Sequence, residues 1–280
     1  MRITDAHLDL AYNALRGRDI SLPAGEQAAD EEGIPTVGFP NLRDGNIDLI
    51  CATLFCAPAI DGKPGYRSPD EAFDAADRQL RWYETQDACG RMRVVRTADE
   101  LDDYFPSIDT KASRQVASAT QSPAAILLLE GADPIRVPAD LHQFHARGVR
   151  IVGLAWKRTR YAGGTGAPGP LSREGIELIA QMDRLNLIHD TSHLAEESFW
   201  QLVDLANGPI IASHSNCRAI VSPDPNERQL SDDMIRAIIS RKGVIGLNFF
   251  DRFLLPPADY GKRRATLRDV IAHIQHICDL

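Results

Sequence analysis

The chain has 280 residues and a formal net charge of −8 at pH 7; 44% of its residues are hydrophobic and 25% are charged. This composition excludes a disordered chain, and the acidic balance disfavours a general binder of nucleic acid or of anionic membranes. The sequence contains no run of about 18 apolar residues, the length that a bilayer crossing requires. The five cysteines lack CxxC spacing, and the N-terminus, MRITDAHLDL, has no apolar leader. We therefore expect a soluble, cytoplasmic protein without disulfides.

Short apolar runs alternate with helical signals along the chain. Capping-box or N-cap residues at Ser68, Thr97, Ser172 and Ser231 each precede an amphipathic stretch. Strands that alternate with helices predict βαβ units and a parallel sheet. Seven runs rich in Ile, Leu and Val are the expected strands: Ile3–Leu10, Ile47–Phe55, Ala124–Glu130, Val149–Trp156, Leu185–Asp190, Pro209–His214 and Gly243–Phe250.

Seven strands nearly complete an eight-stranded (β/α) barrel. A doubly wound open sheet is the alternative, but no GxGxxG motif follows the first strand. The last helix is expected over roughly Thr266–Leu280. We expect its apolar residues to face a barrel wall, namely Val270, Ile271, Ile274 and Ile277.

Residues that bind metals gather where these strands end. In (β/α) barrels the reacting groups lie at the C-terminal ends of the strands. The spacing of His7 and Asp9 directs both side chains to one face of a strand. A charge at Glu130, directly after an apolar run, is costly unless it is paired or bound to a metal. The full set is His7, Asp9, Glu130, Asp190, His193 and His214. It suffices for two divalent cations that share a bridging carboxylate.

Four motifs carry a family resemblance. DAHLDL, ILLLEGADPI, LIHDTSHLAEESF and IIASHSNCRAI follow one another in an order that resembles the membrane (renal) dipeptidase family of zinc peptidases, which includes soluble bacterial members. The segments NLRDG and ERQLSDDMI extend the resemblance along the whole chain. The resemblance implies a TIM-like (β/α)8 barrel, two zinc ions as cofactors, and hydrolysis of dipeptides, some with D residues.

The resemblance also implies roles for individual residues. His7 and Asp9 hold one zinc, Glu130 is the bridging catalytic carboxylate, and His193 and His214 hold the other zinc. Arg228 matches an arginine that contacts the substrate carboxylate. Asp190 matches an acid that orients the second-zinc histidine, as carboxylates behind metal ligands do.

Two positions depart from the family pattern. Trp156 stands where typical members have a histidine that helps bind the scissile carbonyl, so we expect it to line the substrate site and to shift the preference away from ordinary L,L-dipeptides. The family's eighth strand carries an aspartate in a motif like SDFDG, and this chain stops at Leu280 before it. We therefore expect a single barrel domain over residues 1–280 that is C-terminally incomplete, its eighth strand missing beside Ile3–Leu10.

The function predicted from these residues is a binuclear zinc-dependent hydrolase that cleaves a dipeptide or a related small amide, with a metal-bridging water as nucleophile. One alternative is a metal-dependent amidohydrolase that acts on a non-peptide amide or a lactone. The other is a binding homologue with impaired catalysis. The expected partner is the small-molecule substrate, with no nucleic acid or membrane, and a homodimer is a possible assembly.

Overall fold

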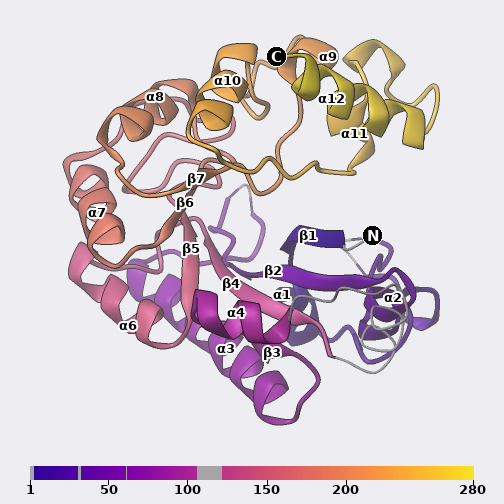
Figure 1. Cartoon of the computed structure of the whole chain (residues 1–280), viewed down its shortest axis with the longest axis vertical. Coiled ribbons are helices and arrows are strands. Elements are labelled where there is room, and N and C mark those ends of the chain that lie inside the picture. Colours follow the sequence, from indigo (N-terminus) through magenta and orange to yellow (C-terminus); the bar gives the residue numbers. More distant parts are fainter. Residues whose placement is uncertain (1–2, 31–32, 61, 106–121) are drawn as a thin grey trace. The chain divides into compact units, whose positions relative to one another are not determined.

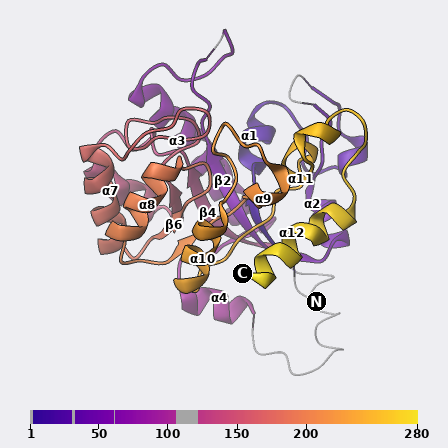
Figure 2. The same cartoon turned by 90° about the horizontal axis from the view of Figure 1, so that it is seen from above.

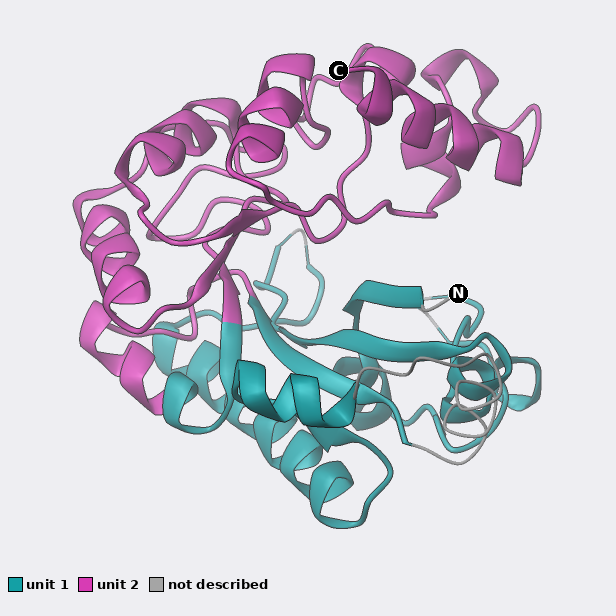
Figure 3. Ribbon diagram, viewed as in Figure 1, with its two compact units in different colours: residues 1–129, 144–150 teal, residues 130–143, 151–280 magenta. Residues whose placement is uncertain are grey.

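The structure is a computed structural model that describes residues 3–30, 33–60, 62–105 and 122–280 (Figure 1). The chain divides into two compact units, residues 1–129 with 144–150 and residues 130–143 with 151–280 (Figure 3). Three elements contribute residues to both: β4 (Ala124–Glu130), α6 (Leu141–Ala146) and β5 (Val149–Gly153).

Unit 1 is built on parallel strands. β1 pairs with β2, and β3 pairs with β4, both in parallel. Its longest helix starts at Ser68, whose hydroxyl accepts the backbone N–H of Glu71, and it ends before Gly90, which has a φ of +74°. The longest helix is α3 (Pro69–Ala88), and the elements before and after it are β1 (Ile3–Leu8), α1 (Leu10–Leu15), η1 (Ala24–Glu26), α2 (Phe39–Asp44), β2 (Ile47–Phe55), β3 (Arg93–Val94) and α4 (Ala98–Tyr104).

Unit 2 continues the same alternation of strand and helix. β5 pairs in parallel with β6 and β6 with β7, and α7 packs beside α8 in both views (Figures 1 and 2). The elements are η2 (Pro138–Asp140), α7 (Arg173–Arg184), β6 (Ile188–Asp190), α8 (Glu196–Leu205), β7 (Ile210–Ile211), α9 (Arg218–Val221), α10 (Asp232–Ser240), α11 (Asp251–Leu254), η3 (Pro257–Asp259) and α12 (Leu267–Asp279).

The segment predicted as the seventh strand, Gly243–Phe250, forms only one bridge, in which Ile245 pairs in parallel with Ala212. The prediction of a full strand was wrong. Beyond the bridge, the side chain of Asn216 forms the hydrogen bonds to the backbone of Asn248: its amide nitrogen donates to the carbonyl, and its oxygen accepts the N–H. A side-chain amide therefore replaces the ladder that a partner strand would form.

The last helix, α12, is confirmed, but its buried face differs from the expected one. Val270 is buried, whereas Ile271 and Ile274 are 49% and 46% exposed. The residue that packs inward with Val270 is His273, whose Nδ1 accepts the backbone N–H of Cys217 at 3.1 Å. A polar anchor, which a hydrophobic pattern cannot reveal, therefore sets the orientation of this helix.

Candidate metal centre

In unit 2, one carboxylate and two imidazoles converge at the ends of three strands of the sheet, β4, β6 and β7. Glu130 is the last residue of β4, His193 lies in the turn after β6, and His214 follows β7. The Nε2 atoms of the two histidines lie 3.2 Å and 3.3 Å from Oε1 of Glu130 and 2.9 Å from each other. All three side chains are buried. Three atoms with lone pairs thus face one point in a site largely shielded from water.

This donor set fits a divalent cation. Ligand atoms held about 2.0–2.2 Å from a tetrahedral ion lie roughly 3.3–3.6 Å apart. The two contacts of Glu130, at 3.2 Å and 3.3 Å, are close to that spacing, and the gap between the histidines, at 2.9 Å, is a few tenths of an ångström shorter. Imidazole nitrogen and carboxylate oxygen are also the ligand types that zinc takes. A small outward movement of one ring would accommodate the ion.

The second nitrogen of each ring is held by a hydroxyl group. Nδ1 of His193 lies 2.9 Å from Oγ1 of Thr165, and Nδ1 of His214 lies 2.8 Å from Oγ of Ser213. Hydrogen bonds of this kind orient a metal-binding imidazole and select its tautomer. Neither hydroxyl was predicted from the sequence. Ser213 directly precedes its histidine, a signal that could have found it, but Thr165 lies in a glycine-rich loop 28 residues before His193.

Asp190 is buried at the end of β6 and lies behind His214. Its Oδ1 accepts the backbone N–H groups of Ser192 and Ser213, and its Oδ2 accepts the hydroxyl of Ser213 at 2.6 Å. The carboxylate therefore reaches His214 through Ser213.

Arg228 is fully enclosed beside these residues. Its Nη2 donates to the carbonyl of His214 at 2.6 Å, its Nη1 donates to Oγ of Ser215 at 3.0 Å, and its guanidinium lies 5.0 Å from the ring centre of Phe253. Burial lowers the pKa of Arg228 to about 10, against the opposing attraction of carboxylates that include Glu130. Its Nε–H is buried and has no hydrogen-bond partner within the described residues. An unpaired buried N–H of this kind is suited to donate a hydrogen bond to an anionic ligand.

Trp156 follows β5 and is half-buried. Its ring centre lies 6.3 Å from that of His193, and Nζ of Lys157 lies 5.8 Å above the indole. The backbone carbonyl of Trp156 accepts the N–H of Thr165, the residue that holds His193. Trp156 is thus connected to His193 in two ways: its ring lies near the imidazole, and its carbonyl holds Thr165, which contacts that imidazole.

His7 and Asp9 lie together at the end of β1 in unit 1. Nε2 of His7 is 3.8 Å from Oδ1 of Asp9, and the same Asp9 oxygen accepts the hydroxyl of Thr53 on β2. The carbonyl of Thr53 in turn accepts the phenol of Tyr83, which is buried in α3. Thr53 is a third hydroxyl that was not predicted from the sequence, because it comes from the neighbouring strand.

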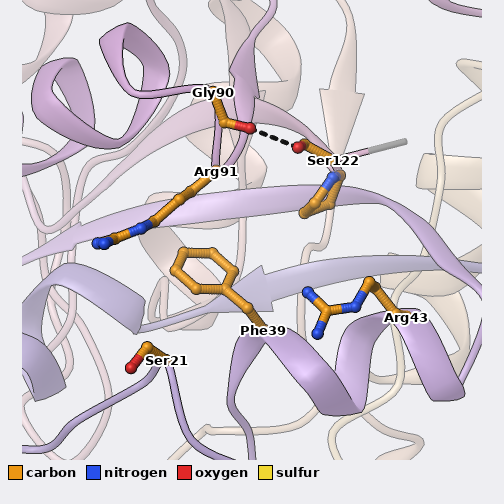
Figure 4. A pocket seen from close by; sticks show the side chains of 7 residues that line it. Ser21, Phe39, Arg43, Gly90, Arg91 and Ser122 are labelled. Carbon is orange, nitrogen blue, oxygen red and sulfur yellow. Dashed lines mark hydrogen bonds between the residues drawn. The ribbon is translucent and has the colours of Figure 1, made fainter. Parts of the chain in front are cut away.

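Unit 1 also has a surface pocket of about 270 Å³ that the sequence analysis did not predict (Figure 4). The close-up shows the guanidinium groups of Arg43 and Arg91 on either side of the Phe39 ring (Figure 4). The lining comprises Ser21, Phe39, Arg43, Gly90, Arg91, Ser122 and Pro123. None of the predicted site residues lines it.

The comparisons with known proteins agree with the resemblance of the motifs. A family model described as membrane dipeptidase (peptidase family M19) matches residues 1–280, and the chain belongs to this family. The chain is 34% identical over 197 residues to an uncharacterized protein encoded in the PQQ-III 3′ region of Acinetobacter calcoaceticus, covering 65% of the chain and 61% of that protein. It is 33% identical over 147 residues to an uncharacterized dipeptidase of Schizosaccharomyces pombe, covering 50% of the chain and 34% of that protein. The chain thus spans about a third to three fifths of these relatives.

Two solved structures resemble the whole chain. One is described as the dipeptidase AC, a metallopeptidase, with a TM-score of 0.77 and 25% identity, covering 100% of this chain and 81% of that one. The other is a metallopeptidase from Rhodobacter sphaeroides bound to a phosphinate mimic of the dipeptide L-Ala-D-Ala, with a TM-score of 0.77 and 24% identity, covering 100% and 82%. The predicted α/β barrel class is confirmed by this likeness. Among the described residues, no helix combines the length and the apolar character that a membrane crossing requires.

Proposed function

We propose that this protein is a zinc-dependent hydrolase that cleaves a dipeptide or a related small amide. The observation that carries the proposal is the convergence of the Glu130 carboxylate with Nε2 of His193 and His214, at 2.9–3.3 Å. Membership of the membrane dipeptidase family supports the substrate class. The ligand in the R. sphaeroides structure, a phosphinate mimic of a dipeptide, points to the same chemistry.

The proposed metal centre holds two zinc ions, with Glu130 as the bridging ligand. His193 and His214 would bind one ion, and His7 and Asp9 the other. Two bound zinc ions would supply an acidified water as the nucleophile and Lewis acidity toward the amide carbonyl. Asp9 is kept in place by the Thr53 hydroxyl.

The other residues of the proposed site bind and orient. The guanidinium of Arg228 would receive the substrate carboxylate through its unpaired Nε–H and an adjacent N–H, a paired geometry that a lysine cannot copy. Trp156 would form an apolar wall of the pocket near His193. Glu130 holds the ligand set together and is not the proton carrier. We further propose a single domain over residues 1–280, a cytoplasmic location and a homodimeric assembly.

Elemental analysis of the purified protein and a dipeptide panel test this function. We expect about two zinc ions per chain, and hydrolysis that disappears on dialysis against a chelator and returns with zinc. Glu130→Gln should lose both metal and activity, whereas Glu174→Gln, at an exposed position of α7, should keep both. Zinc at about 100 times its Kd should stabilise the protein against unfolding by about 2.7 kcal/mol for each site. A protein with the correct zinc content that hydrolyses no dipeptide would refute the substrate class.

A second candidate is a hydrolase of non-peptide amides or lactones on the same metal centre. The proximity of the Trp156 indole to His193 favours it, since an indole donates one hydrogen bond but carries no charge for an oxyanion. Turnover of such substrates, with none of dipeptides, would identify this function. Bound zinc without turnover of either class would indicate the binding homologue.

A further inference from the structure

We propose that Asp190, Ser213 and His214 form a relay of hydrogen bonds that fixes the tautomer of His214, so that its Nε2 is always available to a metal ion. The inference deepens the proposed function, because it concerns the same metal centre. Asp190 and Ser213 are positioning residues here, since they act only through the imidazole. All three side chains are buried in unit 2.

Hydrogen accounting gives the direction of each bond. A serine hydroxyl has one proton, and the Asp190 carboxylate can only accept it across their 2.6 Å contact. Oγ of Ser213 must then act as acceptor in its 2.8 Å contact with Nδ1 of His214. Nδ1 therefore carries the ring proton, and Nε2 keeps its lone pair toward Glu130.

Asp190 is itself held so that it cannot turn away. Its Oδ1 accepts two backbone N–H groups, from Ser192 at 3.0 Å and from Ser213 at 2.9 Å. These bonds leave Oδ2 directed at the Ser213 hydroxyl. The backbone turn after β6 and Ser213, two residues after the short strand β7, therefore set the position of the carboxylate.

The second histidine lacks such a relay. Nδ1 of His193 meets the hydroxyl of Thr165 at 2.9 Å, and within the described part of the chain that hydroxyl contacts no carboxylate. A lone hydroxyl can rotate and either donate or accept, so it orients the ring without selecting the tautomer. The selection comes instead from His214: its Nε2 lone pair lies 2.9 Å from Nε2 of His193, so Nε2 of His193 must carry the ring proton in the metal-free protein.

Asp190→Asn reverses the relay without changing its shape. The amide oxygen would keep the two backbone N–H groups, so the amide nitrogen would point at Ser213 and donate to its Oγ. The Ser213 hydroxyl would then donate to Nδ1 of His214, and the ring proton would move to Nε2, toward the metal position. The variant keeps the packing and inverts the polarity of the bonds; it also removes one negative charge that acts on Arg228, a loss of charge that the control variant Asp183→Asn shares.

Histidine ring ¹⁵N spectra of the metal-free protein, recorded near pH 8, read the tautomer directly. We expect His214 as the Nδ1–H form in the wild type and as the Nε2–H form in Asp190→Asn. His193, whose Nε2 lies 2.9 Å from Nε2 of His214, should change in the opposite sense, from the Nε2–H form to the Nδ1–H form. An Nε2–H form of His214 in the wild type, or an unchanged tautomer in a folded Asp190→Asn variant, would overturn the relay.

Zinc affinity, measured by competition with a chromogenic chelator, gives the functional consequence without any substrate. Asp190→Asn should weaken zinc binding by about 10–100-fold, the usual effect of losing a partner of a metal ligand. Ser213→Ala, which leaves no hydroxyl to donate to His214, should lose less than Asp190→Asn. A greater loss in Ser213→Ala would show that packing alone is responsible and would overturn the proposal.

Asp183→Asn is a matched control. Asp183 also accepts backbone N–H groups and holds a buried histidine, His189, at 2.9 Å, but it does not contact the candidate ligands in unit 2. This variant should bind zinc like the wild type. If zinc binding follows the relay but no dipeptide is hydrolysed, the proposed function fails and the relay stands. If Asp190→Asn binds zinc and hydrolyses dipeptides as the wild type does, the relay fails and the function stands.

Discussion

Replacing Arg228 by lysine separates the two tasks that the structure gives this residue. The guanidinium donates one hydrogen bond to the carbonyl of His214 and one to Oγ of Ser215, and it lies over the ring of Phe253. A lysine ammonium at the end of a flexible stem can replace one of these hydrogen bonds but not both in the same geometry. Burial, which already lowers the pKa of the arginine to about 10, would also lower the pKa of the lysine and weaken its charge near neutral pH.

The expected magnitudes follow from these contacts. Loss of one hydrogen bond from a charged donor costs about 1.5–3 kcal/mol, and a weaker cation–π contact adds roughly 0.5–1 kcal/mol. We therefore expect Arg228→Lys to lower the free energy of unfolding by about 2–4 kcal/mol. If the unpaired Nε–H receives the substrate carboxylate, KM for a dipeptide should also rise about 10–100-fold, the equivalent of one charged hydrogen bond.

Urea unfolding measures the first effect, and steady-state kinetics with zinc-loaded protein measures the second. Zinc content should stay the same, because Arg228 contacts the backbone of His214 and not its ring. Arg43→Lys, at an exposed position of α2, is the matched control and should change neither quantity. An unchanged KM in a destabilised Arg228→Lys variant would show that the arginine only supports the fold.

Three further predictions concern the stability of the fold and the substrate preference. Gly175→Ala should destabilise the protein by more than about 2 kcal/mol in urea unfolding, because a Cβ there would lie 2.1 Å from the carbonyl of Tyr161, whereas Gly25→Ala meets nothing within 4 Å and should be nearly neutral. Burial lowers the pKa of His273, so below about pH 6.5 the unfolded state binds more protons than the native state. The free energy of unfolding should therefore decrease as the pH is lowered through this range, by up to about 1.4 kcal/mol per pH unit. His273→Gln should show a flatter dependence on pH. Trp156→His should gain hydrolysis of L,L-dipeptides in a substrate panel, and unchanged turnover would remove this position from the control of specificity.

Helix starts could be predicted closely from the sequence, because each depends on local chemistry. The hydroxyls of Ser68, Thr97, Ser172 and Ser231 all accept a backbone N–H three residues later. The short strand β3 was missed, since two residues are too few to show a periodicity. The strand expected at Gly243–Phe250 failed for the opposite reason: its apolar pattern is strong, but its pairing depends on what lies beside it.

The candidate ligands were accessible to sequence analysis because charged residues stand out at the ends of apolar strands. Their partners were not, because a hydroxyl is common and its role depends on a neighbour far away in the chain. Thr53 reaches Asp9 from 44 residues away, and Thr165 reaches His193 from 28. Only a three-dimensional structure brings such residues together.

The backbone beside the candidate ligands is held in conformations that most residues avoid. His193 has a φ of +68°, and Glu227, next to Arg228, has a φ of +51°. A left-handed conformation at a residue with a side chain costs of order 1–3 kcal/mol, so it persists only where surrounding contacts enforce it. At His193 the hydroxyl of Thr165 and the carboxylate of Glu130 hold the ring from two sides. At Glu227 the carboxylate accepts the backbone N–H of Glu196 at 2.8 Å. The two unfavourable conformations therefore lie in the turns that position the candidate metal ligand His193 and the buried cation Arg228. A site whose residues are held in place before the ligand binds would require such conformations at these positions.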